Sequence, residues 1–226
     1  MDRQSTCWTL VQGAARGVEE DVDMFVRLYG PVVNAYVSTR WPSPPLRDNL
    51  EDAVQEVFVE CFKEGGVLDR AGPGTLGSFR AFLLGVARNV SLRFESRMGR
   101  DKDVVQAVGF NPDQMAAEDE RLSLAFDRAW ARALLKEAVS RQAERARIFG
   151  PDAEKRVELL RLRFQEGKKL RSIAEQWNVE HPWLKRQNAQ ALQEFEDALK
   201  EVMAFHYPNA PAEAEREMAT ILAALR

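Results

Sequence analysis

Apolar residues recur along almost the whole chain at the three-to-four-residue spacing of an amphipathic helix, whereas the alternating pattern of a β-strand is scarce. Side chains three and four positions apart share one face of a helix, so this spacing predicts helices that each bury one stripe. The interruptions coincide with proline and glycine, which end helices. We therefore predict an all-α protein. The chain has 226 residues, of which 45% are hydrophobic, which is enough for one or two domains with apolar cores.

The breaks between helices predict how the chain is organised. Helices are expected at residues 22–40, 49–63, 78–97 and 122–149, and a loop with several glycines is expected at 68–77. Residues 101–127 contain two basic and seven acidic residues, the composition of a linker, with helix allowed near its end. We predict an N-terminal segment, a helical domain, this linker, a second helical domain and a C-terminal helical extension, at residues 1–21, 22–100, 101–127, 128–202 and 203–226.

Several classes of protein are excluded by composition. No stretch approaches the ~18 consecutive apolar residues of a membrane span, and the N-terminus lacks the pattern of an export signal, so we expect a cytoplasmic protein without membrane insertion. Cys7 and Cys61 are expected to be reduced, with Cys61 buried. His181 and His206 lack neighbours at metal-ligand spacing, and His206 is expected at the surface. We expect no metal, no cofactor and no catalytic residues, hence no enzyme.

The predicted helix at 49–63 has two distinct faces. Its apolar stripe consists of Val54, Val57, Phe58, Cys61 and Phe62. A second face carries Asp52, Gln55, Glu56 and Val59. A solvated surface is the simpler interpretation of that face. Because Val59 is apolar, a docking surface for a partner is the alternative.

The predicted helix at 78–97 is basic. Five arginines and one acid occur within residues 76–100. Its expected buried stripe is Phe79, Phe82, Leu83, Val86 and Val90, with Arg80, Arg88 and Ser91 opposite and Asn89 and Arg93 on a flank. Guanidinium groups match the geometry of phosphate oxygens, so this helix is a candidate nucleic-acid contact. Ordinary surface arginine is the alternative.

A helix–turn–helix is predicted in the second domain. The first helix presents Leu170, Ile173, Ala174 and Trp177 and ends at Asn178, a residue that tolerates the left-handed conformation of a tight turn. Pro182 suits the first turn of the next helix, whose expected buried residues are Leu184, Ala191, Leu192, Phe195 and Leu199. The candidate base-reading residues are His181, Trp183, Lys185, Arg186, Gln187 and Gln190. A helical bundle without a DNA role is the alternative.

Three runs of the chain resemble one family. The first two runs are Asn49-Leu50-Glu51-Asp52-Ala53-Val54-Gln55-Glu56-Val57-Phe58 and Gly77-Ser78-Phe79-Arg80-Ala81-Phe82-Leu83 with Ala87-Arg88-Asn89. They resemble region 2 of bacterial extracytoplasmic-function sigma factors, which belong to the sigma-70 family. The third is similar to sigma region 4 and consists of Arg161-Leu162-Arg163-Phe164-Gln165-Glu166-Gly167 with Ile173-Ala174-Glu175. The resemblance implies a three-to-four-helix bundle for region 2 and a helix–turn–helix for region 4.

The resemblance also implies partners. The resemblance implies that the clamp coiled coil of the RNA polymerase β′ subunit would be bound by Asp52, Gln55, Glu56 and Val59. The melted −10 promoter element would be held by the 68–77 loop together with Arg80, Arg88, Asn89 and Arg93. The second helix of the helix–turn–helix would read the −35 element. The polymerase β flap and an anti-sigma factor are further partners that the resemblance implies.

The chain departs from the family at two places, and the departure in the reading helix leaves a second function open. Arg93 stands where these proteins often have an acid, and the run from Pro182 to Asn188 differs from the usual G-T-V-K-S-R-L-like sequence. Residues 156–202 contain nine basic and eight acidic residues, so we expect weak or differently specific binding to duplex DNA. The alternative function is a sigma-derived helix–turn–helix regulator or adaptor that does not itself initiate transcription.

Overall fold

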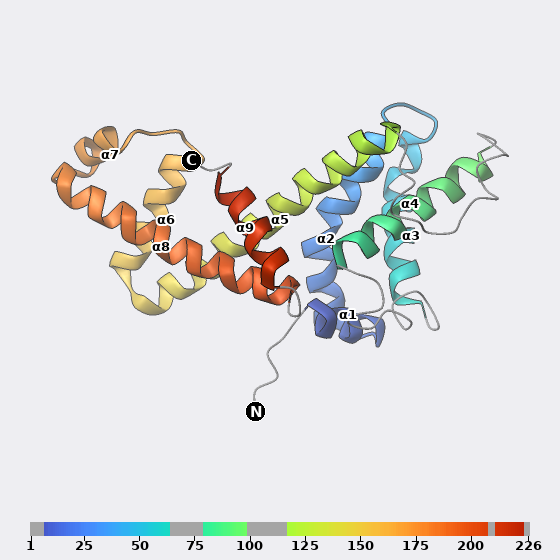
Figure 1. Cartoon of the computed structure of the whole chain (residues 1–226), viewed down its shortest axis with the longest axis horizontal. Coiled ribbons are helices and arrows are strands. Elements are labelled where there is room, and N and C mark those ends of the chain that lie inside the picture. Colours follow the sequence, from blue (N-terminus) through green and yellow to red (C-terminus); the bar gives the residue numbers. More distant parts are fainter. Residues whose placement is uncertain (1–6, 64–78, 99–116, 208–210, 224–226) are drawn as a thin grey trace. The chain divides into compact units, whose positions relative to one another are not determined.

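The chain forms helices throughout the part that its computed structural model describes, residues 7–63, 79–98, 117–207 and 211–223 (Figure 1). Helices account for 88% of these described residues, and no strand occurs among them. The predicted all-α fold is therefore confirmed. No described helix has both the length and the apolar character that a membrane crossing requires.

The chain divides into two compact units. Unit 1 comprises Met1–Ala133 with Phe205–Ala214, and unit 2 comprises Leu134–Ala204 with Glu215–Arg226. Two long helices, α5 (Ala117–Phe149) and α8 (His181–His206), contribute residues to both units. Residues 117–133, part of which we assigned to the linker, belong to unit 1.

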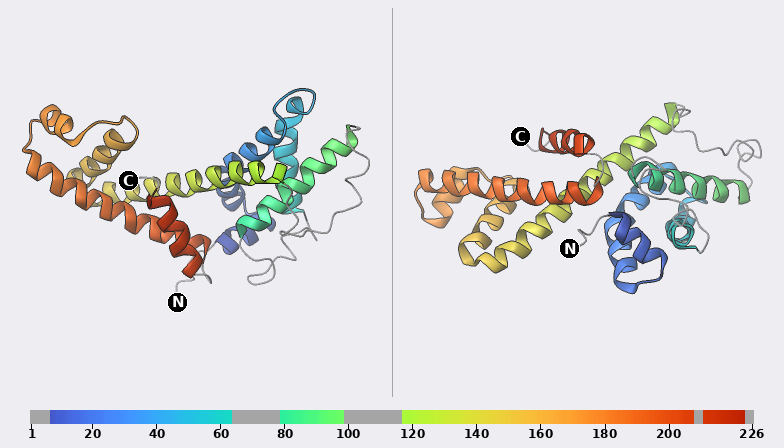
Figure 2. Two further views of the ribbon diagram at one scale, coloured as in Figure 1. Left: turned by 45° about the horizontal axis from the view of Figure 1, so that its top comes forward. Right: turned by 60° about the horizontal axis from the view of Figure 1, so that its bottom comes forward.

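Unit 1 is built on α2 (Glu19–Arg40), which contacts α3 (Leu50–Phe62) and α4 (Phe79–Arg97). The short helix α1 (Cys7–Ala15) packs along α2, and α3 lies beside α4 (Figure 2). A single 3-10 turn, η1 (Arg47–Asn49), leads into α3. The helix α2 ends immediately before Trp41-Pro42, as the sequence predicts, because a residue before proline is disfavoured in helix.

The core of unit 1 is aromatic. All five residues of the predicted stripe on α4 are buried, from Phe79 to Val90. On α3, Val57, Phe58 and Cys61 are buried, whereas Val54 and Phe62 are half-buried. Ser91, expected on the opposite side of α4, is fully buried, and its hydroxyl donates to the Ala87 carbonyl at 2.8 Å. A small hydroxyl satisfied within its own helix is tolerated in a core, which a periodicity argument does not anticipate.

Unit 2 contains the last part of α5, then α6 (Pro151–Phe164), α7 (Leu170–Trp177) and most of α8. The predicted helix end at Gly150-Pro151 is confirmed, since α5 ends at Phe149. Gly150 has φ 93°, a conformation that favours glycine, and Pro151 occupies the first turn of α6. The core of this unit is an aliphatic cluster made of Leu159, Leu162, Ile173, Ala174 and Leu184.

Other predictions for the second domain have mixed outcomes. Leu184, Ala191, Phe195 and Leu199 of α8 are buried as expected, but Leu192 is exposed, so its assignment to the core was wrong. The extension beyond residue 203 contains the end of α8 and the helix α9 (Pro211–Ala223). The predicted 68–77 loop, linker residues 101–116 and N-terminal residues 1–6 lie outside the described residues.

Candidate protein and nucleic-acid interfaces

The predicted docking face of α3 is open to solvent over most of its length. Asp52, Gln55 and Val59 are exposed, and Glu56 is half-buried. These four residues fall at positions i, i+3, i+4 and i+7, which places them on one face of the helix. Val59 exposes 53% of its surface although it is apolar. The structure therefore leaves the predicted face available, with one apolar side chain among polar ones.

This docking face adjoins the predicted DNA face of α4. Across the α3–α4 contact, Arg97 lies 3.6 Å from a carboxylate oxygen of Glu56, and Arg93 lies 3.2 Å from one of Glu60. Arg93, which we assigned to DNA, is thus an ion-pair partner of an α3 acid. The sequence treats the acidic and basic helices as two surfaces, but the packing of α3 on α4 makes them neighbours.

Arg80 contacts α5, a helix that the sequence does not predict as its neighbour. Its Nη2 atom forms an ion pair and hydrogen bond with Oδ1 of Asp127 on α5. The Nε atom of Arg80 is buried and has no hydrogen-bond partner among the described residues. The other two predicted residues of this face, Arg88 and Asn89, are half-buried on α4.

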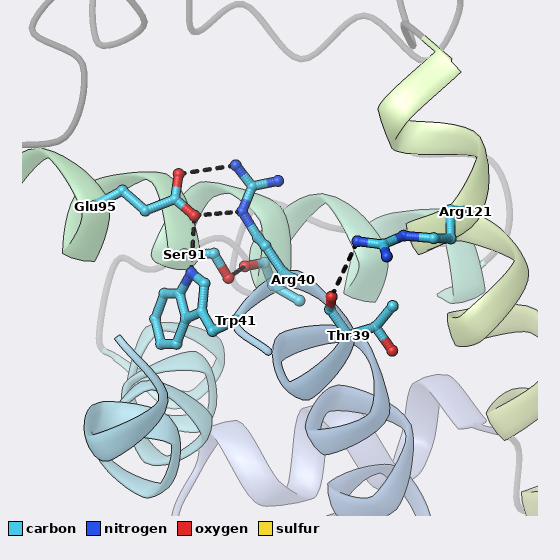
Figure 3. A network of polar contacts seen from close by, with 7 residues as sticks. Thr39, Arg40, Trp41, Ser91, Glu95 and Arg121 are labelled. Atoms are coloured by element: carbon cyan, nitrogen blue, oxygen red, sulfur yellow. Dashed lines mark hydrogen bonds and ion pairs between the residues drawn. The ribbon is translucent and has the colours of Figure 1, made fainter. Parts of the chain in front are cut away.

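Another ion pair of unit 1 was not predicted from the sequence. Arg40, at the end of α2, donates from Nε and Nη2 to the two carboxylate oxygens of Glu95 on α4, at 2.6 and 2.9 Å (Figure 3). The indole Nε1 of the buried Trp41 donates to the same carboxylate at 2.8 Å. The one available signal was Glu95 itself, the single acid within residues 76–100.

This Glu95 cluster fixes the end of α2 on α4. Burial acts to lower the pKa of Arg40, but the hydrogen bonds and charge of Glu95, with a contribution from Tyr36, outweigh burial and raise that pKa. The arginine therefore stays charged. The cluster thus ties the C-terminal end of α2, just before the Pro42 break, to α4.

We expected His206 at the surface, but it is buried in unit 1. Its Nε2 atom lies 3.2 Å from the hydroxyl of Tyr29, and its ring packs edge-on against Trp130 with centroids 5.4 Å apart. Phe205 and Tyr207 are buried beside it in the sequence. The aromatic core of unit 1 thus includes residues that lie far away in the sequence.

Cys61 is buried as predicted. Its burial, helped by the charge of Glu60, raises the pKa of its thiol to about 12, which makes the thiol unreactive at neutral pH.

The turn of the helix–turn–helix has the predicted conformation. Asn178 is left-handed, with φ 51° and ψ 50°. Its amide donates to the Glu175 carbonyl at 3.2 Å, and the next amide, of Val179, donates to the Ala174 carbonyl at 3.0 Å. These bonds satisfy the last carbonyls of α7, as in a Schellman ending. The chain then enters α8 at His181, with Pro182 in the first turn as expected.

The candidate reading residues divide into three groups. Lys185, Arg186 and Gln190 are exposed on the first part of α8, and Gln190 donates to Glu194 at 3.2 Å. His181 and Gln187 are half-buried. Trp183 is partly buried and packs against the aliphatic cluster of unit 2, so part of its ring is used by the core.

Polar contacts that the sequence did not predict join α8 to α5 and α6 within unit 2. Asn188 is buried and accepts a hydrogen bond from Nη1 of Arg163 at 2.7 Å. The Gln142 side chain donates to the Ala191 carbonyl at 3.0 Å, and Arg156 pairs with Glu194 at 2.7 Å. Arg156 and Arg163, which are among the nine basic residues of 156–202, are therefore engaged within the unit.

The described residues contain no group of three or more His, Cys, Asp or Glu side chains placed to hold a metal ion. Comparison with known proteins adds no assignment, because no protein-family model, no curated protein and no solved structure matches this chain.

Proposed function

We propose that this protein is an alternative sigma factor of the extracytoplasmic-function type, which binds RNA polymerase core and directs it to specific promoters without performing catalysis itself. The observation that carries the proposal is the helix–turn–helix of unit 2. Behind a left-handed turn at Asn178, the first turns of α8 expose Lys185 and Arg186. Arginine and lysine at that position of a reading helix contact base edges and phosphates in the major groove.

The polymerase contact is proposed for α3. Its exposed face carries acidic and amide side chains around the apolar Val59. An exposed apolar residue ringed by polar ones is typical of a protein-binding surface. The resemblance of this helix to sigma region 2 identifies the β′ clamp coiled coil as the partner that we propose. The β flap and an anti-sigma factor remain further proposed partners.

The −10 contact is proposed for α4 and for the loop before it. A melted strand needs positive charge along its backbone, and α4 carries Arg80, Arg88 and Arg93. Asn89 is half-buried on a flank of the same helix. A phosphate would have to compete with Asp127 for Arg80 and with Glu60 for Arg93.

That competition favours a second candidate function, a helix–turn–helix regulator that keeps the sigma scaffold and does not initiate transcription. Arg80 and Arg93, which would hold the melted strand, both have carboxylate partners within the protein. Trp183 is partly buried against the aliphatic cluster of unit 2, so part of its ring is not available to DNA. Such a protein would retain duplex binding through α8 and would lack strand capture through α4.

In vitro transcription with purified bacterial RNA polymerase core and genomic DNA fragments distinguishes the two candidates. A sigma factor yields transcripts that start at a small set of promoters. The double variant Lys185→Ala/Arg186→Ala should reduce initiation at these promoters by about tenfold or more, because it removes two contacts to DNA. The slope of the logarithm of the duplex-binding constant against the logarithm of salt concentration should also decrease in magnitude by about two, because two cations are removed.

The matched control is Lys155→Ala/Lys200→Ala. It removes the same charge from exposed positions of unit 2, and Lys200 lies about 22 Å along α8 from Lys185 at the rise of a helix. This control should leave initiation nearly unchanged. Core binding without promoter-specific transcripts would favour the regulator. Equal effects of the two double variants would contradict the assignment of the reading residues.

A further inference from the structure

The first part of α5, residues 117–133, packs against α2 and α4 within unit 1 as an amphipathic segment, here called the arm. Its residues Leu122, Phe126, Ala129 and Trp130 are all buried, at the i, i+4, i+7 and i+8 spacing of one helix face. Trp130 stacks on Tyr29 with ring centroids 5.6 Å apart, and Phe126 meets Tyr36 edge-on at 6.4 Å. The arm is therefore held by apolar burial rather than by its charges.

The arm places the carboxylate of Asp127 beside the basic helix α4. Asp127 directly follows the buried Phe126 and reaches Arg80 in the first turn of α4. At the other end of the contact, Arg121 donates to the Thr39 carbonyl at 3.4 Å (Figure 3). The pair of Asp127 and Arg80 keeps side-chain exposures of 36% and 30%, so it lies where solvent or a ligand also reaches.

A half-exposed ion pair of this kind is displaceable. Pairs in contact with water contribute little to stability, because screening and side-chain entropy offset their attraction. The present pairing is also incomplete, since the buried Nε atom of Arg80 has no hydrogen-bond partner among the described residues. A guanidinium that turned toward a phosphate could use its fork of donors, which a single contact to Asp127 does not.

We propose that Asp127 is an autoinhibitory group that occupies Arg80 and thereby lowers the affinity of α4 for a single-stranded nucleic acid. This inference rests on the part of the proposed function that assigns Arg80 to such a strand. The carboxylate takes the place that a backbone phosphate would take on the guanidinium. It also repels an approaching phosphate. Strand binding then requires exchange of one anion for another, and the arm can stay docked through its apolar face while this happens.

The test measures binding of a fluorescein-labelled single-stranded DNA of mixed sequence, about 16 nucleotides long, to the full-length chain by anisotropy at fixed low salt. Asp127→Asn keeps the shape of the side chain and removes its charge. We expect it to tighten binding about three- to fivefold. The matched control Asp23→Asn removes the same charge from an exposed position of α2 in unit 1 and should change affinity by less than half as much.

Arg80→Gln makes the test specific. If Asp127 acts through Arg80, the gain from Asp127→Asn disappears in the Arg80→Gln background. Thermal unfolding checks that the variants fold, and Asp127→Ser serves as a second variant should Asp127→Asn lower the midpoint. A gain no larger than that of Asp23→Asn, or one that persists without Arg80, would overturn the proposal. Absence of strand binding in both wild type and Asp127→Asn would overturn it as well.

Failure of this inference and failure of the proposed function give different results. If the wild-type chain initiates transcription but Asp127→Asn gains no affinity, the sigma assignment stands and the autoinhibitory contact does not. If no promoter is used but Asp127→Asn binds the strand more tightly through Arg80, the contact regulates strand binding in a protein that is not a sigma factor.

Discussion

The two units of this protein build their cores in different ways. The core cluster of unit 2 comes from one continuous stretch, residues 159–184, and consists of aliphatic side chains. The core of unit 1 is aromatic and collects rings from α2, α4, α5 and the end of α8, so that Tyr29 contacts residues as distant as His206. The aliphatic cluster of unit 2 lies within one stretch of the chain, whereas the aromatic core of unit 1 is made of segments that meet only in the folded chain.

The candidate functional groups differ in the same way. On α8 of unit 2, Lys185 and Arg186 are presented by a local turn and are exposed. On α4 of unit 1, Arg80 is reached by Asp127 from 47 positions away in the sequence. At these two places, the cations presented by a local turn are exposed, whereas the arginine reached by a distant segment is partly compensated. Unit 1 is therefore where binding is most open to regulation.

The strongest test of this comparison replaces one tryptophan in each unit. Trp130 is buried to 1% exposure among the rings of unit 1, so Trp130→Ala should cost about 3–5 kcal/mol of unfolding free energy. Trp183 only packs on the edge of the unit 2 cluster, and Trp183→Ala should cost about 1 kcal/mol. Hydrogen exchange during denaturant titration, read on peptides of α2 and α6, assigns each loss to its unit. Equal costs would contradict the difference between the two cores.

The same contrast explains which features could be predicted from the sequence. The stripe on α4, the ends of α2 and α5 and the left-handed Asn178 depend on residues close together in the chain, and each of these predictions is confirmed. Periodicity and Gly, Pro or Asn signals act over a few residues, which is why they succeed at this range.

Two of the features that were missed depend on partners far away in the sequence. His206 looks like a surface residue near a proline, and only the fold brings it to Tyr29. Asp127 looks like one of several acids in a linker until α5 docks and places it on Arg80. Leu192 has the spacing of a core residue, but α8 has no neighbour covering it within the described residues and it stays exposed. No local pattern encodes these outcomes.

A second test compares ion pairs in the two units. Glu95 has 18% side-chain exposure and accepts hydrogen bonds from Arg40 and Trp41, so Glu95→Gln should destabilise unit 1 by about 1–3 kcal/mol because a buried guanidinium loses its counter-charge. In unit 2, Glu158 pairs with Arg161 at 45% exposure. Glu158→Gln is the matched control and should have a much smaller effect, since exposed pairs contribute little. Urea midpoints of the two variants check the ranking, which a larger cost at Glu158 would reverse.

The smallest expected effect is at the turn of the helix–turn–helix. Asn178 adopts a left-handed conformation that costs a β-carbon-bearing residue without a compensating polar side chain about 1 kcal/mol. Asn178→Ala should therefore lower the stability of unit 2 by about that amount, whereas Asn178→Gly should be neutral or slightly stabilising, because glycine adopts this conformation freely. Hydrogen exchange of the α7 and α8 amides measures both. If alanine and glycine have the same effect, local backbone conformation does not set this turn, and unit 2 depends on distant contacts as much as unit 1 does.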